Sequence, residues 1–243
     1  MHKSIFITGA ASGIGLATAK LFHQEGWFVG CYDIDIQALD ELEKNLVDRC
    51  HTAYLDVRNK ENVDACMAEF AKYTNGHLDV MFNNAGVGAA CDTLGEALSK
   101  WQVLRRMIDI NVNACCLGTY LALEAFKRDG TSRGSVVTTA SMAGLLPVGA
   151  PPIYSMTKAA NIQFTRSTAA QLGGDASDIR VYALCPSYTA TGLGPDPEVI
   201  KAALGGVLLP SHMAEGFMLL CEGDLPNGSV MRVTARRRGT RVV

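Results

Sequence analysis

A tyrosine and a lysine lie one helical turn apart in the segment "YSMTK", residues 154–158. If a helix begins here, the phenol of Tyr154 and the ammonium of Lys158 leave the same face of it and can interact. A free phenol titrates near about 10, and a desolvated ammonium beside it favours the ionised phenolate. The pair therefore suits proton transfer near neutral pH, with Tyr154 as the acid or base.

Ser141 ends the apolar segment "GSVVTTAS", thirteen residues before Tyr154. The carboxyl ends of parallel strands border a ligand crevice, so the Ser141 hydroxyl is expected to hydrogen-bond a substrate oxygen there. Each residue alone has an ordinary alternative, because serines end many strands and a Tyr-x-x-x-Lys spacing arises by chance. Their joint placement after a glycine-rich turn favours the catalytic interpretation.

That turn is "TGAASGIG", residues 8–15, between a short apolar segment and a helix-like one. Gly9, Gly13 and Gly15 allow a sharp bend and bring backbone N–H groups to a pyrophosphate at the positive end of a helix. Their G-x-x-x-G-x-G spacing differs from the G-x-G-x-x-G dinucleotide fingerprint. A glycine turn without any ligand stays open as the alternative.

Asp33 ends the segment "WFVGCYD", eighteen residues after Gly15. A carboxylate there can accept hydrogen bonds from the ribose hydroxyls of adenosine and would repel a 2′-phosphate. Ser12 precedes Gly13, and no basic residue follows Asp33 before Lys44, so nothing evident neutralises such a phosphate. The pattern predicts NAD(H) over NADP(H), with a simple strand-end turn at Asp33 as the alternative.

These residues must be positioned by elements that alternate along the chain. β-rich apolar segments lie at 4–9, 27–33, 52–57, 78–86, 134–141, 179–186 and 228–235, with helix-period segments at 14–25, 36–48, 60–73, 101–128 and 155–172. This order predicts an α/β fold of the Rossmann-like, doubly wound kind, with a seven-stranded parallel sheet covered by helices on both faces. We expect one domain over 1–243, with a cofactor half of about 1–140 and a catalytic and substrate half of about 141–243. The Pro/Gly-rich stretch 186–198 is a candidate lid.

The composition bears on partners and compartment. With 22 basic and 24 acidic residues, the chain has no overall charge that would favour nucleic acid, and the arginines at 236, 237, 238 and 241 are read as a solvated end. The start has no signal-peptide pattern and no 18-residue apolar run follows, so we expect a cytoplasmic protein outside the membrane. The eight cysteines lack paired spacing and are expected to be reduced, with no metal site.

The ordered motifs together resemble the short-chain dehydrogenase/reductase family over nearly the whole chain. The matching stretches are "TGAASGIG", "YDID", "LDV", "NNAG", "INVNA", "ASMAG", "YSMTK" and "CPSYTAT". Within that family, the stretches "GTYLALEAF", "AGLLPV" and "NGSVMRVT" look similar to the branch of the NAD-dependent hydroxyprostaglandin dehydrogenases and insect-type alcohol dehydrogenases.

The resemblance implies roles for individual residues. It implies a catalytic tetrad of Asn111, Ser141, Tyr154 and Lys158, in which Asn111 holds a water that links Lys158 to solvent. It implies cofactor contacts for Gly9, Ser12, Gly13, Ile14, Gly15, Asp33, Asp56, Val57, Asn84, Ala85, Gly86, Tyr154, Lys158, Pro186, Thr189 and Thr191. The chain departs from the family pattern at Ser187, where glycine is usual, which puts the contact of Thr189 in doubt.

The expected activity is the NAD-dependent interconversion of a secondary alcohol and a ketone. Few charges accompany the apolar residues expected near the site, which are Leu145, Leu146, Val148, Pro151, Pro152 and Tyr188, so a small apolar or mildly polar substrate is predicted. The resemblance implies a homodimer or homotetramer, formed through helices 101–128 and 155–172 and the last strand. A dinucleotide-binding regulator without turnover, or an interaction protein that uses the arginine-rich end, is the alternative.

Overall fold

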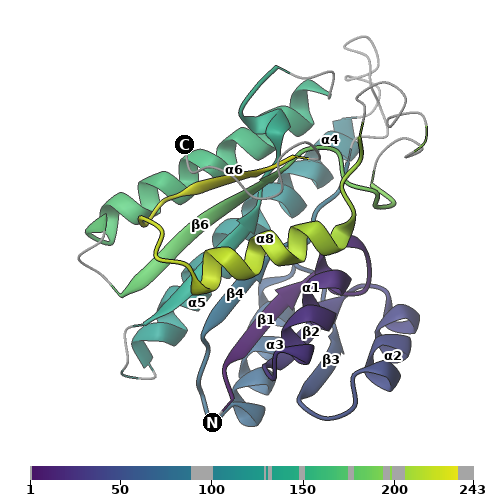
Figure 1. Cartoon of the computed structure of the whole chain (residues 1–243), viewed down its shortest axis with the longest axis vertical. Coiled ribbons are helices and arrows are strands. Elements are labelled where there is room, and N and C mark those ends of the chain that lie inside the picture. The colour runs from purple at the N-terminus through teal and green to yellow at the C-terminus, as the bar shows by residue number, and fades with distance from the viewer. Residues whose placement is uncertain are drawn as a thin grey trace.

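The chain folds around one parallel sheet, as the alternation of segments predicts. The computed structural model describes residues 2–88, 101–128, 130, 133–147, 151–174, 178–193, 198 and 206–234. The seven strands lie in the order β3-β2-β1-β4-β5-β6-β7, and all pairs are parallel (Figure 1). They are β1 (Ser4–Thr8), β2 (Phe28–Asp33), β3 (Cys50–Tyr54), β4 (Val80–Asn83), β5 (Gly134–Thr139), β6 (Ile179–Pro186) and β7 (Val230–Val233).

Helices cover both faces of this sheet. They are α1 (Gly13–Gln24), α2 (Ile36–Asn45), α3 (Lys60–Tyr73), α4 (Trp101–Ile108), α5 (Ala114–Arg128), α6 (Pro152–Gln171) and α8 (Pro210–Glu222), with a π-helix at Asp109–Asn113 and a 3₁₀ turn at Met142–Gly144. The predicted Rossmann-like single domain is confirmed.

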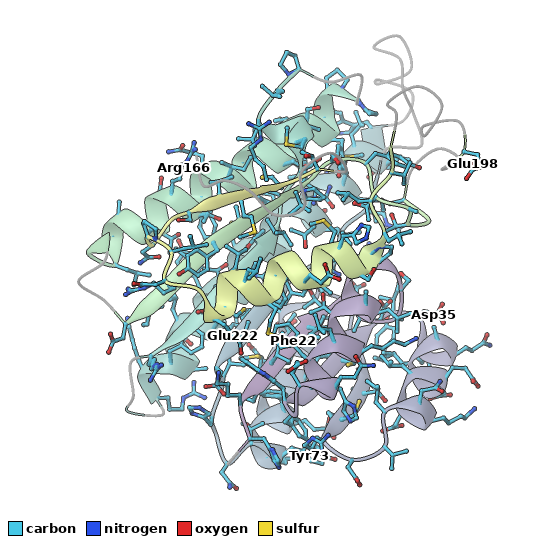
Figure 2. The ribbon with its side chains drawn as sticks, in the orientation of Figure 1. Phe22, Asp35, Tyr73, Arg166, Glu198 and Glu222 are labelled. Carbon is cyan, nitrogen blue, oxygen red and sulfur yellow. The ribbon has the colours of Figure 1, made fainter. Side chains whose placement is uncertain are left out.

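Two apolar cores lie on opposite faces because successive side chains of a strand point to opposite sides. Ile5 and Ile7 of β1 belong to the core under α1, α2 and α8, whereas Phe6 faces α3, α5 and α6. Phe22 of α1 packs on Phe217 of α8, with ring centroids 5.0 Å apart, near the centre of Figure 2. The strands are thus buried on both faces, which fits their nearly continuous apolar sequence.

Three expectations about elements were wrong in detail. The strand expected at 52–57 is Cys50–Tyr54, because the chain turns at Asp56, whose carbonyl accepts a hydrogen bond from Asn59 N–H. The continuous helix expected at 101–128 is divided by the π-helix that contains Asn111. Helix α8 was absent from the expected segments, although Pro210 at its start and the buried Met213, Phe217 and Leu220 follow helical spacing.

The strand order reverses between the two central strands, β1 and β4. From β1 the chain continues through β2 and β3 to one edge of the sheet, and from β4 it continues through β5, β6 and β7 to the other. At such a switch point, an open α/β sheet has a crevice outside the carboxyl ends of its strands. The glycine turn after β1, the segment after β4 and Ser141 after β5 all follow these ends. The fold therefore brings the sequence-predicted residues to one edge of the sheet.

Candidate active site

The glycine turn after β1 is too tight for side chains at Gly9 and Gly15. Gly9 has φ +68°, and a Cβ at this position would lie 2.9 Å from the Cα of Ala85. A Cβ at Gly15 would lie 2.0 Å from the carbonyl oxygen of Gly9. Ser12, at the N-cap of α1, makes no side-chain capping hydrogen bond. The turn thus leaves bare backbone at the positive end of α1, where a pyrophosphate can bind.

Gly15→Ala tests this cradle. We expect the substitution to destabilise the protein by about 1–3 kcal/mol, because backbone has to move, and to abolish nucleotide binding. Gly192→Ala is the matched control, since its Cβ would meet no described atom within 4 Å. Thermal unfolding and NADH titration of both variants check the prediction. A Gly15→Ala protein with the stability and the NADH affinity of wild type would contradict it.

Asp33 lies at the end of β2 beside the glycine turn. Its Oδ2 accepts a hydrogen bond from Ala11 N–H at 3.0 Å, and its Oδ1 accepts one from Asp35 N–H at 3.1 Å. These two bonds fix the carboxylate, and each oxygen keeps a lone-pair direction for a further donor. The expected proximity of Asp33 to the cradle is therefore present.

Asp56 and Val57 lie in the turn after β3. The Arg58 guanidinium holds Asp56 in a two-point ion pair, with Nε–Oδ1 at 2.9 Å and Nη2–Oδ2 at 2.6 Å. That pairing lowers the pKa of the Asp56 carboxyl. Val57 lines a cavity together with Ala85. Arg58 was not singled out from the sequence, although an arginine two residues after an aspartate at a turn was a visible signal.

The "NNAG" segment joins neighbouring strands at the sheet edge. Asn84 Nδ2 donates to the carbonyl oxygens of Thr8 and Gly9, each at 3.1 Å, and Thr139 Oγ1 donates to Asn84 Oδ1 at 3.0 Å. The Asn84 side chain is therefore committed to the sheet edge. A Cβ at Gly86 would lie 3.4 Å from Asn111 Oδ1 and 3.6 Å from Lys158 Nζ, so this glycine borders the catalytic candidates.

The segment after β6 crosses the glycine turn. A Cβ at Gly13 would lie 3.1 Å from Thr191 Cγ2, so Thr191 lies against the turn. Thr189 is buried, and its hydroxyl donates a hydrogen bond to the carbonyl oxygen of Ser187 at 3.1 Å. Ser187 directly follows Pro186, the last residue of β6. Ser187 lies outside the left-handed region and donates its N–H to Val233 O at 2.8 Å. Serine is thus accommodated where the family usually has glycine.

Ser141, Tyr154 and Lys158 come together where β5 meets α6. Tyr154 lies in the first turn of α6, and its phenol is in hydrogen-bond contact with the Ser141 side chain. Ser141 Oγ also accepts a hydrogen bond from Ala143 N–H at 3.1 Å, which fixes the hydroxyl at the start of the 3₁₀ turn. Lys158 Nζ lies 5.7 Å from the centre of the Tyr154 ring and donates to Thr139 O at 2.7 Å.

Asn111 reaches this group from the π-helix. Its Oδ1 accepts a hydrogen bond from Val87 N–H at 2.9 Å, and its Nδ2 donates to Val87 O at 3.0 Å and Thr157 Oγ1 at 3.2 Å. Thr157 Oγ1 in turn donates to Tyr154 O at 2.7 Å. Thr157 and Thr139 were not singled out from the sequence. Thr157 links Asn111 to the first turn of α6, and the Thr139 carbonyl accepts the hydrogen bond from Lys158.

Burial dominates the electrostatics of the Tyr154–Lys158 pair. It lowers the pKa of the Lys158 ammonium to about 8, because this side chain is only 3% exposed. It raises the pKa of the Tyr154 phenol, and the hydrogen bond with Ser141 opposes that rise only in part. The expected lowering of the Tyr154 pKa by Lys158 is therefore wrong for this structure, where the ammonium is directed to the Thr139 carbonyl.

Other expectations concern the surroundings. Leu145 packs beside the buried Ala140 and Cys185, whereas Leu146 is 49% exposed. Val148 and the arginines at 236, 237, 238 and 241 lie outside the described residues. The cysteines that the structure describes are free thiols. Across these same parts of the chain, none of the helices has both the length and the apolar character needed to cross a bilayer.

Comparison with known proteins identifies the family. The sequence profile described as short chain dehydrogenase matches residues 3–197. The chain belongs to the short-chain dehydrogenase family. This short-chain dehydrogenase is an oxidoreductase that acts on CH–OH groups, as its relatives are named dehydrogenases.

Its relatives cover almost the full length of this short-chain dehydrogenase. A 15-hydroxyprostaglandin dehydrogenase [NAD(+)] of Mus musculus is 31% identical over 97% of this chain and 91% of its own. Momilactone A synthase of Oryza sativa subsp. japonica is 36% identical over 91% and 84%. The crystal structure of a 3-ketoacyl-(acyl-carrier-protein) reductase from Brucella melitensis, complexed with NADH, has a TM-score of 0.85 at 27% identity, covering 97% of this chain and 98% of that one.

Proposed function

We propose that this chain interconverts a secondary alcohol and a ketone with NAD(H), and that Tyr154 exchanges the hydroxyl proton. The observation that carries the proposal is the contact of Tyr154 with Ser141 at the same sheet edge as the glycine cradle. Neither feature alone specifies this reaction, but together they provide a proton donor or acceptor and a nucleotide cradle on one crevice.

The residues at the edge fit a dinucleotide. The glycine turn brings backbone N–H groups to the start of α1, where Ser12 makes no side-chain cap, and this positive helix end favours the negative charge of a pyrophosphate. Asp33 would accept hydrogen bonds from the adenosine ribose, and Thr191, against Gly13, would contact the pyrophosphate side. Val57 and Ala85 would line the cofactor. When bound, the nicotinamide supplies the hydride acceptor or donor.

Tyr154 and Ser141 would handle the substrate oxygen. In oxidation, Tyr154 accepts the hydroxyl proton as hydride leaves the carbon, and in reduction it returns a proton to the oxygen. Ser141 donates a hydrogen bond to the same oxygen and holds it near the phenol. Both residues are half-buried, and a hydrogen bond that is partly shielded from water is stronger than one in bulk water.

Lys158 and Asn111 would fix the geometry around Tyr154. The Lys158 ammonium is positioned by Thr139 O and is close enough to Gly86 to meet a ribose hydroxyl beside it. A positive charge there would hold the nucleotide ribose beside Tyr154. Asn111 holds the segment after β4 and, through Thr157, the first turn of α6.

The NAD preference is tested by titrating the protein with NADH and NADPH, followed by fluorescence. We expect wild type to bind NADH at least tenfold more tightly than NADPH, because a 2′-phosphate would approach the Asp33 carboxylate. Asp33→Ala should weaken NADH binding about tenfold, or roughly 1.4 kcal/mol, and reduce or reverse the preference. The name of the relative 15-hydroxyprostaglandin dehydrogenase [NAD(+)] supports this choice.

Asp35→Ala is the matched control for that titration, since this neighbouring acid caps α2 through Ala38 N–H. Equal affinity of wild type for NADH and NADPH would overturn the proposed preference. If neither nucleotide bound, the proposed activity itself would fall.

A small apolar or mildly polar substrate is part of the proposal. The residues beyond Ser141 and before Tyr154 include Leu145, Leu146, Pro151 and Pro152, and Tyr188 follows β6. An apolar surround favours substrates with little charge. A panel of secondary alcohols with NAD, from short chain to terpenoid, measures this preference by initial rates.

We also propose that the chain assembles as a dimer or tetramer through α4, α5 and α6 and through the last strand, β7. Tyr120 of α5 is 56% exposed and lies edge-on to Phe164 of α6, with ring centroids 5.9 Å apart, which forms an aromatic surface across the two helices. Phe126 and Ile162 of the same helices give no support to this assembly, because both are buried inside the chain itself. Sedimentation of wild type and Tyr120→Glu tests the assembly.

A further inference from the structure

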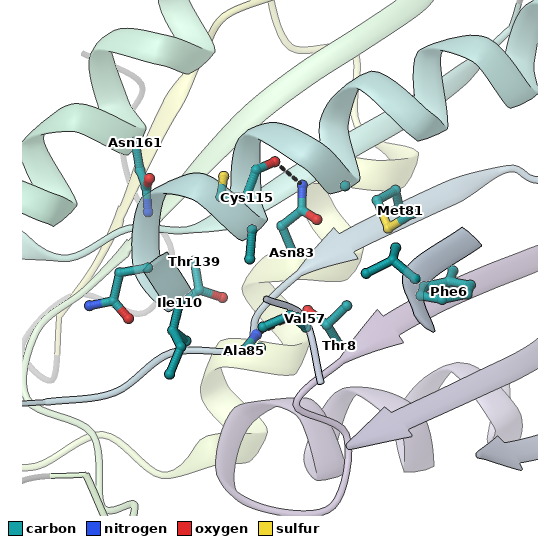
Figure 3. A pocket seen from close by; sticks show the side chains of 14 residues that line it. Phe6, Thr8, Val57, Met81, Asn83, Ala85, Ile110, Cys115, Thr139 and Asn161 are labelled. Carbon is teal, nitrogen blue, oxygen red and sulfur yellow. Dashed lines mark hydrogen bonds between the residues drawn. The ribbon is translucent and has the colours of Figure 1, made fainter. Parts of the chain in front are cut away.

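A small cavity lies under the candidate site, between the carboxyl ends of the central strands and α6 (Figure 3). Its polar lining consists of Thr8, Asn83, Asn111, Cys115, Thr139 and Asn161. Its volume is about 20 Å³, counted as space for the centres of water-sized spheres. By that measure roughly 10–15 Å³ is enough for one water molecule.

Most polar groups around the cavity already have protein partners. Asn111 is bonded to Val87 and Thr157. Asn83 Nδ2 donates to Cys115 O at 3.3 Å, an interaction drawn as the dashed line in Figure 3, and to Thr119 Oγ1 at 3.1 Å. These bonds fix the walls of the cavity.

Asn161 differs from the other lining residues. The residue is only 2% exposed, and no hydrogen bond joins its side-chain amide to another described residue. Figure 3 shows this amide directed from α6 toward the space beside Cys115 and Thr139. A buried amide without partners is unfavourable, and most such groups in proteins are paired with protein or with ordered water.

We propose that the cavity holds one ordered water molecule, bound by the Asn161 amide. An amide offers two N–H donors and a carbonyl acceptor, and the Thr139 carbonyl, which accepts from Lys158, has a second lone pair. A water needs two to four such partners, and the Asn161 amide together with the Thr139 carbonyl can supply them.

Asn161 follows Lys158 by three residues, so the two side chains share the face of α6 that packs on the sheet. The water therefore supports the Thr139 carbonyl that positions the Lys158 ammonium, and Asn161 is a positioning residue for it. This consequence for turnover rests on the proposed function, whereas the water site itself does not.

The test combines structure and kinetics. A high-resolution crystal structure of wild type is expected to show a water within hydrogen-bond distance of the Asn161 amide. Asn161→Leu replaces the amide with an apolar group of similar volume, which should expel the water, leave the thermal midpoint unchanged or higher, and lower kcat three- to tenfold at unchanged NADH affinity. Asn161→Ser leaves room for the water and supplies a hydroxyl that can bind it, so its kcat should be close to that of wild type.

Thr165→Val is the control, because Thr165 is buried one turn further along α6, outside the cavity lining. Its kcat should match wild type. A wild-type structure with an empty cavity, or with the amide bonded directly to protein, would overturn the water site. A water that is present while Asn161→Leu keeps full kcat would overturn the positioning role alone, and an enzyme without any NAD-linked turnover would instead refute the proposed function.

Discussion

Tyr154→Phe is expected to lower kcat/KM by about 10²–10⁴-fold, the range that a single general acid or base contributes. The substitution removes one oxygen from a side chain that is half-buried at the start of α6. Since the ring remains, packing and the position of Lys158 should be retained, and the affinity for NADH should change by less than twofold. Initial rates with the best alcohol of the panel, together with NADH titration, measure both quantities.

Tyr120→Phe provides the control, because this tyrosine is exposed on α5 and its phenol lies outside the candidate site. It should retain wild-type rates. A Tyr154→Phe enzyme with more than about a tenth of the wild-type kcat/KM would show that another group transfers the proton, since such a small loss lies below the range for general acid–base catalysis. The Ser141 hydroxyl would then be the next candidate, because it is the group in hydrogen-bond contact with the phenol.

The sheet and the nucleotide cradle could be predicted because their signals are local. Buried parallel strands are continuously apolar, and a turn that excludes side chains requires glycine, as at Gly15. Asp33 follows from its place at the end of a strand. Each of these inferences depends on a few neighbouring residues and on a general rule of α/β topology.

The connections among the catalytic candidates could not be predicted in this way. Asn111 bonds to Val87, 24 residues earlier, and to Thr157, 46 residues later, and no local pattern encodes such pairs. The π-helix around Asn111 likewise interrupts a sequence that reads as one continuous helix. Residues such as Asn161 are visible in the sequence, but their significance depends on burial and on missing partners, which only three dimensions reveal.

The direction of the Tyr154 pKa illustrates the same limit. The i, i+4 spacing correctly indicates that Tyr154 and Lys158 share a helix face, and their separation of 5.7 Å from ring centre to Nζ agrees with it. Spacing does not determine how far each group is desolvated, and here burial outweighs the charge. The pKa of the Tyr154 phenol is raised and that of the Lys158 ammonium is lowered, so burial favours the neutral form of both side chains in this structure.

Lys158→Met is expected to make the protein more stable at neutral pH while lowering kcat/KM by about 10²–10³-fold, the loss typical of one preorganised electrostatic group. Lowering the pKa of Lys158 from 10.5 to about 8 corresponds to roughly 3 kcal/mol against the charged folded form. Methionine is also unbranched and fits the buried site, but loss of the bond to Thr139 O removes about 1 kcal/mol. A net gain of about 1–2 kcal/mol should remain at pH 7.

The stability that Lys158→Met gains over wild type should decrease as the pH rises. Below about pH 8 the lysine is charged in both the folded and the unfolded chain, so the full desolvation penalty is present. Between about 8 and 10.5 the folded protein binds fewer protons at Lys158 than the unfolded chain, so wild type gains stability with pH relative to the variant. The advantage of Lys158→Met should therefore vanish near pH 10.5.

The difference between the two proteins is the quantity to measure, because both also lose stability in alkali. Burial raises the pKa of Cys115 to about 11 and that of Cys185 to about 12, so the unfolded chain loses these thiol protons first. Denaturant unfolding of wild type, Lys158→Met and the exposed control Lys72→Met at pH 7 and pH 10 separates these effects. If Lys158→Met proved less stable at pH 7, the ammonium would be a net support of the fold. A more stable but inactive variant would instead show that the site keeps a buried charge at the expense of stability, as expected where a residue is retained for chemistry.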